Sequence, residues 1–168
     1  MDGFRCTMLQ KLGILRSSGC SYVMISLALV KNKKGKSAIH ISARYGHSDI
    51  VQLLMDTCPD TLGLLDKKGR TSLHIAAKKG RRNVVRTLLM APQLQDHLLN
   101  ARDENGNTPL QLAALAGQGN VLFMLLNDAR VNKRVVNNAI LTTLDIVQSS
   151  TLLQNFMEVC FVNLCTPQ

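Results

Sequence analysis

The sequence predicts an all-α fold, a solenoid in which helix–turn–helix units repeat along the chain. The first observation is self-similarity, because Gly35, Gly69 and Gly106 can be set in register with periods of 34 and 37 residues. The second is composition: hydrophobic residues make up 46% of the 168 residues, aromatic residues only 4%, and Trp is missing. A core of aliphatic side chains with few rings suits stacked thin helices better than a β-sandwich.

Each copy opens with the signals of a short first helix. Two residues after each glycine stand Ser37, Thr71 and Thr108, whose side-chain oxygens suit a helix N-cap. Pro109 then occupies the first helical position, where its missing N–H costs nothing. Small pairs such as Ala76-Ala77 follow and let the helix pack closely. First helices are therefore predicted at 37–45, 71–79 and 108–116.

A second helix follows in each copy. The glycines that end the first helices can take a left-handed turn at little steric cost, and they are Gly46, Gly80 and Gly117. Equivalent apolar residues then recur at helical spacing, namely Ile50, Val84 and Val121, followed by Leu54, Leu88 and Leu125. Second helices are predicted at 49–55, 82–90 and 120–127. Asn32, Asp66 and Asp103 precede the register glycines by three and supply turn chemistry for a projecting loop.

Two phrases resemble a known repeat signature. Thr71-Ser72-Leu73-His74-Ile75-Ala76-Ala77 and Thr108-Pro109-Leu110-Gln111-Leu112-Ala113-Ala114 are similar to the Thr-Pro-Leu-His-x-Ala-Ala signature of the ankyrin-repeat family, and Gly46-His47 is similar to its Gly-His turn. The resemblance implies an ankyrin-repeat solenoid of helix–turn–helix units joined by β-turn fingers. It also implies that His40 and His74 brace loop backbones rather than catalyse a reaction. Three clear repeats are expected over residues 31–136.

The two ends depart from this pattern. Residues 137–168 are predicted to form a decayed repeat and a C-terminal cap, in which Asn137 and Thr142 keep their offsets. Ile140 replaces the register glycine there, so we expect a distorted finger. In residues 1–30, the segment Gly19-Cys20-Ser21-Tyr22-Val23 resembles the start of a repeat, but Gly35 follows only 16 residues later. Residues 1–30 are thus either an irregular N-terminal cap or a truncated repeat from an incomplete gene model.

Residues 98–110 and Leu144-Asp145-Ile146 resemble plant ankyrin-repeat proteins of the accelerated-cell-death type, in which a four-helix membrane domain follows the repeats. The resemblance implies a role in plant signalling or defence. No stretch here reaches the roughly 20 apolar residues that span a bilayer, so a cytoplasmic protein is expected. The alternative is a membrane-associated fragment at the cytoplasmic face, acting with full-length relatives or anionic lipid.

Motifs for catalysis or cofactor binding are missing from the sequence. The five cysteines are odd in number and form no CxxC pair, which argues against a disulfide framework and a zinc site. No nucleophile elbow, phosphate loop or HExxH pattern occurs. We therefore expect no enzyme activity, no cofactor, no metal and no small-molecule substrate.

Charge is the feature that points to a partner. Residues 31–90 hold 13 of the 20 Lys and Arg but 4 of the 11 Asp and Glu, so they carry the whole net charge of +9. In an ankyrin stack, fingers and first helices line the concave face. The sequence thus predicts a protein–protein interaction module that presents a basic concave face to an acidic partner; the simpler alternative is that the charge only aids solubility. Nucleic acid is disfavoured, because aromatic platforms beside the basic residues are lacking. The candidate partner-binding residues are Lys33, Lys34, Lys36, Arg44, Tyr45, Lys67, Lys68, Arg70, Lys78, Lys79, Arg81 and Arg82.

Overall fold

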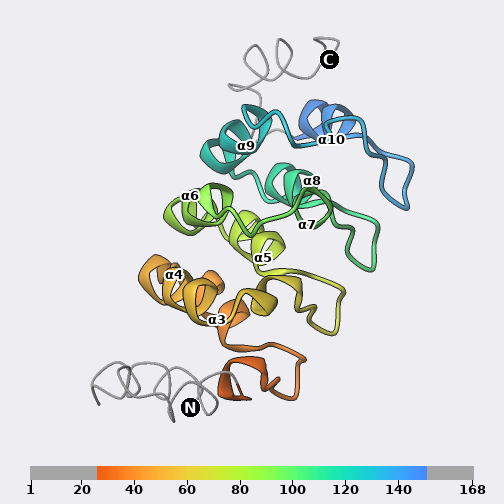
Figure 1. The fold of residues 1–168 in the computed structure, drawn as a ribbon. Coiled ribbons are helices and arrows are strands. Elements are labelled where there is room, and N and C mark those ends of the chain that lie inside the picture. The colour runs from red at the N-terminus through yellow and green to blue at the C-terminus, as the bar shows by residue number, and fades with distance from the viewer. Residues whose placement is uncertain (1–25, 151–168) are drawn as a thin grey trace.

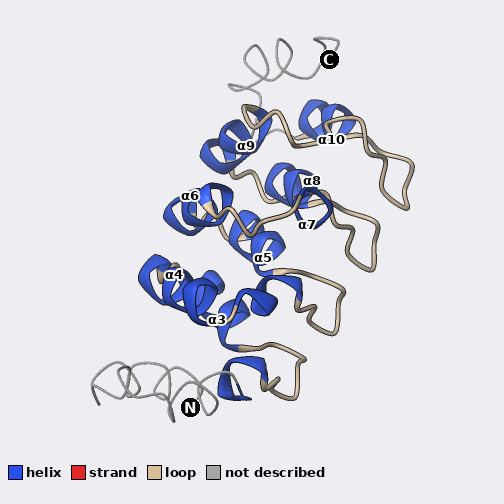
Figure 2. Ribbon diagram, in the orientation of Figure 1, coloured by secondary structure: helices blue, strands red, loops and turns tan. Residues whose placement is uncertain are grey.

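The structure is a computed structural model that describes residues 26–150, and it shows helical pairs stacked in one direction (Figure 1). The pairs are α3 (Ala38–Tyr45) with α4 (Ser48–Thr57), α5 (Ser72–Lys78) with α6 (Arg82–Met90), and α8 (Pro109–Leu115) with α9 (Gly119–Leu126). Helix α10 (Thr143–Ser149) follows. Residues 26–150 contain no strand (Figure 2). The predicted all-α solenoid is confirmed, and every predicted helix end lies within two residues of its observed position.

The stack has an inner and an outer row of helices. The inner helices α3, α5, α8 and α10 pack on one another in that order, and the outer helices α4, α6 and α9 pack against them. Four loops project from the inner side, away from the outer row (Figure 1). We call them fingers 1 to 4, over residues 31–36, 65–70, 102–107 and 136–141. Two short helices, η1 (Pro59–Gly63) and α7 (Asp96–Leu99), lie in the connections that lead from an outer helix to the next finger.

Every inner helix begins with the same cap. The N-cap residue is Ser37, Thr71, Thr108 or Thr142, and each forms a reciprocal capping box with the third helical residue. In α5, for example, the Thr71 hydroxyl accepts a hydrogen bond from the His74 amide at 3.4 Å, and the Thr71 amide donates to His74 Nδ1 at 3.2 Å. These bonds satisfy N–H groups that the helix itself leaves unpaired. The predicted N-caps are confirmed.

The third helical residue also reaches the next repeat. His40 Nε2 lies 3.0 Å from the Arg70 carbonyl oxygen, and His74 Nε2 lies 3.1 Å from that of Asn107. Gln111, in the same register, donates to the Leu141 carbonyl at 3.0 Å. Since a carbonyl can only accept, Nε2 of each histidine carries a hydrogen, and both rings brace a finger as expected.

Each finger turns around one Asp or Asn side chain. In finger 2, Asp66 Oδ1 accepts from the amides of Lys68 and Arg70 at 2.9 and 3.1 Å. The same two bonds recur in the other fingers, to Asn32, Asp103 and Asn137. The register glycine completes the turn with a left-handed backbone, at φ +71° for Gly35 and +73° for Gly106. Turn chemistry predicted from these Asp-x-x-Gly and Asn-x-x-Gly spacings is therefore confirmed.

Finger 4 corrects the prediction of a distorted loop. Ile140 takes φ 60°, the left-handed conformation of the glycines it replaces, and its amide donates to the Asn137 carbonyl at 3.0 Å as theirs do in their own fingers. A β-branched residue in that conformation costs on the order of 1–3 kcal/mol. Steric room explains why it is tolerated. A Cβ on Gly106 would lie 2.8 Å from the amide nitrogen of Asn138 in finger 4, whereas no described finger follows Ile140.

Aliphatic side chains between the two rows form the core. Val84, Leu88, Val121 and Leu125 are almost fully buried, which confirms the apolar stripe predicted for α6 and α9. In α4, Leu54 is buried as predicted, but Ile50 is only partly buried and its neighbour Val51 is fully buried. Cys58 is a free, buried cysteine in this core. The predictions for residues 1–25 and 151–168, including the other four cysteines, lie outside the described residues.

Leu88→Ala should lower the free energy of unfolding by about 2–5 kcal/mol, because Leu88 is 0% exposed and its truncation leaves a cavity between repeats. Urea unfolding of the full chain measures the change. Arg86→Ala, at an exposed position of the same helix, is the control and should stay within about 0.5 kcal/mol. A loss below about 0.5 kcal/mol for Leu88→Ala would place Leu88 outside the core.

Stability should fall as pH drops from about 6.5 toward 4. Burial lowers the pKa of His74 to about 4, and protonation would also place an N–H against the Thr71 amide. The unfolded chain, with a histidine pKa of about 6.5, then binds the proton that the folded chain excludes. The cost should reach about 2 kcal/mol near pH 5 and vanish above the unfolded pKa.

The control for this pH dependence is His74→Gln, which copies the residue that caps α8. Glutamine accepts from the N-cap amide and donates to the next finger, as Gln111 does, without titrating. Urea midpoints of both proteins at about pH 7.5 and pH 5 make the comparison. Identical pH dependence of the wild type and His74→Gln would contradict the assignment to His74.

Candidate functional site

Backbone hydrogen bonds join neighbouring fingers and set their spacing. The amide of Glu104 donates to the Lys68 carbonyl at 3.0 Å, and the amide of Asn138 donates to the Asn105 carbonyl at 3.0 Å. A longer contact of 3.5 Å joins the Lys67 amide to the Lys34 carbonyl. The finger tips are therefore held at fixed positions beside one another.

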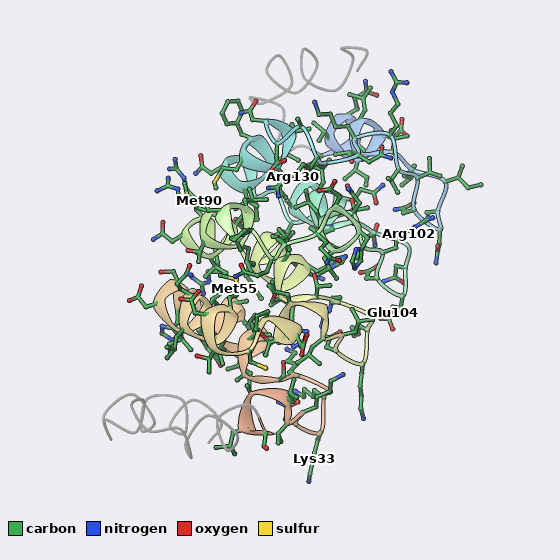
Figure 3. The ribbon with its side chains drawn as sticks, viewed as in Figure 1. Lys33, Met55, Met90, Arg102, Glu104 and Arg130 are labelled. Atoms are coloured by element: carbon green, nitrogen blue, oxygen red, sulfur yellow. The ribbon has the colours of Figure 1, made fainter. Side chains whose placement is uncertain are left out.

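The candidate residues at the tips of fingers 1 and 2 form one exposed group, which we call the finger lysines: Lys33, Lys34, Lys67 and Lys68. Figure 3 shows Lys33 extending from the tip of finger 1, away from the body of the stack. Lys68 Nζ lies 3.6 Å from a carboxylate oxygen of Glu104 in finger 3, and both side chains are largely exposed. The row of finger lysines is thus followed, on finger 3, by the acidic side chain of Glu104.

Other candidates gather at the opposite end of the inner helices, around the turns to the outer helices. They are exposed and form the turn group: Arg44, Tyr45, Lys78, Lys79, Arg81 and Arg82. The Arg44 guanidinium lies 5.8 Å from the centre of the Tyr45 ring, and Arg81 Nε donates to the Arg44 carbonyl at 3.0 Å. An inner helix of eight residues such as α3 is about 12 Å long, so it separates the two groups by roughly that distance.

Lys36, at the base of finger 1, links these two groups electrostatically. Partial burial lowers its pKa, and the positive charges of Arg44, Arg70 and Lys34 lower it further. Arg44 belongs to the turn group and Lys34 to the finger lysines, so Lys36 feels both. Lys36 thus lies among positive charges from both groups, while the Asp66 carboxylate opposes their effect on its pKa.

Arg70 differs from its expected role as an exposed charge. Two nitrogens of its guanidinium donate to one oxygen, Asp66 Oδ2: Nη2 at 2.7 Å and Nε at 3.1 Å. The Arg70 side chain is only 16% exposed. Burial opposes ionisation of Asp66, but the hydrogen bonds from Arg70 and the finger amides outweigh it and hold the pKa of this carboxyl below its usual value. Arg70 thus fixes finger 2 and contributes little free charge.

The third repeat carries different side chains at the same positions. Glu104 and Asn105 replace the finger lysines, while Leu115 and Ala116 replace Lys78 and Lys79. Leu115 is 54% exposed, so its aliphatic side chain is accessible at the position where the first two repeats carry Arg44 and Lys78. Exposure of the Leu115 side chain follows from the repeat register, because the equivalent residues Arg44 and Lys78 are exposed as well.

Two further features bear on chemistry. Within residues 26–150, no three His, Cys, Asp or Glu side chains are grouped so that they could hold a metal. No helix of the described part of the chain is long and apolar enough to cross a membrane.

Comparison with known families finds two matches. The family described as "Ankyrin repeats (3 copies)" matches residues 14–96, and the one described as "Ankyrin repeat" matches residues 105–138. Together they cover well over half of the chain. No curated protein matches it.

Arg70→Ala should destabilise the chain by about 1–3 kcal/mol, because the Asp66 carboxylate, whose side chain is 1% exposed, loses a charged partner. Lys67→Ala, on the same finger but exposed, should change stability by less than about 0.5 kcal/mol. Urea unfolding of both variants tests the contrast. If both had equal effects, the pair would not hold finger 2.

Proposed function

The chain belongs to the ankyrin-repeat family, whose repeats generally mediate protein–protein interaction, and we propose that it binds an acidic partner protein on the basic surface of its first two clear repeats. The observation that carries this proposal is the row of four exposed finger lysines on two adjacent, mutually bonded fingers. All of the net charge of the chain lies in residues 31–90, where these lysines stand.

Pre-organisation of the fingers favours binding of a partner. The fingers are fixed by their Asp or Asn side chains and by bonds to neighbouring fingers, so little backbone entropy is lost when a partner docks. The exposed lysines draw an acidic surface from a distance and speed association. Fingers and inner helices, which line the concave side of such stacks, present the docking surface. Proteins built only of these repeats are typically interaction modules without enzymatic activity.

The likenesses of residues 98–110 and 144–146 to plant ankyrin proteins support a role in signalling or defence, exercised through such a partner. An anionic membrane surface offers the same charge complementarity, with about 1 kcal/mol for each basic residue near it. Binding to anionic vesicles is therefore measured alongside binding to peptides.

Reversing Lys67 and Lys68 to Glu should slow association with acidic partners by about tenfold or more at low salt, because long-range attraction mainly sets the on-rate. Binders are first selected from a random displayed peptide library on the full chain, and their on-rates are then measured for both proteins at two salt concentrations. Raising salt should slow the wild type more than the variant, given a screening length of about 8 Å at physiological strength.

The control reverses Arg86 and Arg134, two exposed arginines outside the candidate set, and so changes net charge by the same amount. The control should associate nearly as fast as the wild type. If both variants slowed association equally, the effect would come from net charge alone, and the proposed docking surface on the fingers would be contradicted. Co-sedimentation with anionic vesicles, but no selected acidic peptide, would replace the protein partner by a membrane.

A further inference from the structure

The ends of the inner helices present a row whose chemistry changes along the stack. Arg44, Lys78 and Leu115 occupy equivalent positions on α3, α5 and α8, and all three are exposed. Because α5 packs between α3 and α8, the three side chains follow one another in that order. The row is cationic over two repeats and aliphatic at the third.

Folding does not account for Leu115. Its side chain is 54% exposed and lies outside the hydrophobic core, so it adds little to the packing of α8. Ala116 beside it is small and half-buried, which leaves the leucine accessible. An aliphatic side chain presented next to Lys78 and Lys79 can bind an apolar group that follows an acidic one.

Spacing identifies the shape of the segment that fits. Packed helices lie about 8–10 Å apart, so Arg44, Lys78 and Leu115 are each separated by roughly that distance. A polyproline II segment has three residues per turn and rises about 3.1 Å per residue, so residues i, i+3 and i+6 share one face at intervals of about 9 Å. The two intervals match, whereas a β-strand presents i and i+3 on opposite faces.

We propose that this row binds an extended, polyproline II-like segment of a partner protein with acidic residues at i and i+3 and an aliphatic residue at i+6. The acidic residues pair with Arg44 and Lys78, and the aliphatic side chain packs on Leu115. This inference rests on the proposed function, since it specifies which acidic partner the basic surface takes.

The test uses the full 168-residue chain, labelled with ¹⁵N, and synthetic peptides. The probe is Glu-Pro-Pro-Glu-Pro-Pro-Leu, studied together with its reversed sequence because either chain direction satisfies the spacing. Three comparison peptides end in Ser, end in Glu, or carry Leu one residue early. Amide shifts yield the dissociation constants and locate the peptide. The leucine peptide should bind about tenfold more tightly than the serine peptide, and moving Leu by one residue should remove most of this gain.

Leu115→Lys copies the residue of the second repeat and should invert the preference. The leucine gain should disappear, while the peptide with three glutamates should bind more tightly than it binds the wild type. The control is Met90→Lys, which adds the same charge at the end of α6, where the Met90 side chain is 76% exposed. This variant should leave the leucine gain unchanged.

The outcomes separate the two proposals. Control peptides replace every Glu by Gln; if the glutamate peptides bind no better than these controls, the proposal of a basic docking surface is contradicted. If glutamate peptides bind but leucine adds nothing, or its gain survives in Leu115→Lys, only this inference is overturned. Self-association of the free chain that Leu115→Lys abolishes would also overturn it, because the occupant would then be a second copy.

Discussion

The side chain at the third position of α3, α5 and α8 joins each of these helices to the next finger, and the stack depends on this contact. His40, His74 and Gln111 each close a capping box with one face and bind a carbonyl of the following finger with the other. Local capping and long-range stacking are thereby fixed by one group. The position therefore needs a side chain that accepts from the N-cap amide and donates to a carbonyl of the next finger, and a neutral imidazole and an amide both do so.

The capping boxes and the hydrogen bonds between repeats use backbone groups and buried side chains, so they leave the identity of most exposed side chains unconstrained. The same exposed position holds Arg44, Lys78 and Leu115 in three repeats whose caps and finger turns are nearly identical. Substitution at such positions changes what the stack presents without changing how it folds. Arg70, although a candidate binding residue, has a structural role, because it forms an ion pair with the buried Asp66 inside finger 2.

Much of the fold could be predicted from the sequence because the repeats carry local signals. N-caps, turn glycines and apolar spacing lie within a few residues of the structure they specify, and bracing by His40 and His74 followed from the family signature. The pairing of Arg70 with Asp66 was missed, although the sequence contains a signal for it. Of the four residues around which the fingers turn, only Asp66 is followed four residues later by an arginine, Arg70, whose guanidinium can donate two hydrogen bonds to it. The division of the candidate residues into two groups was missed as well, because charge counting ignores the length of the inner helix.

Finger 4 shows where local patterns cease to decide. The sequence marks Ile140 as a lost glycine, and loss of glycine from a left-handed turn ordinarily predicts distortion. Whether a Cβ fits depends instead on the neighbouring finger, which blocks it at Gly35 and Gly106. At Ile140 only the backbone cost remains, and the hydrogen bonds of Asn137 to the amides of Ala139 and Leu141 hold the turn against it. At Gly35 and Gly106 glycine is therefore required by the next finger as well as by its left-handed backbone, whereas an added Cβ on Gly69 would meet its nearest neighbour, the Glu104 amide nitrogen, at 3.3 Å.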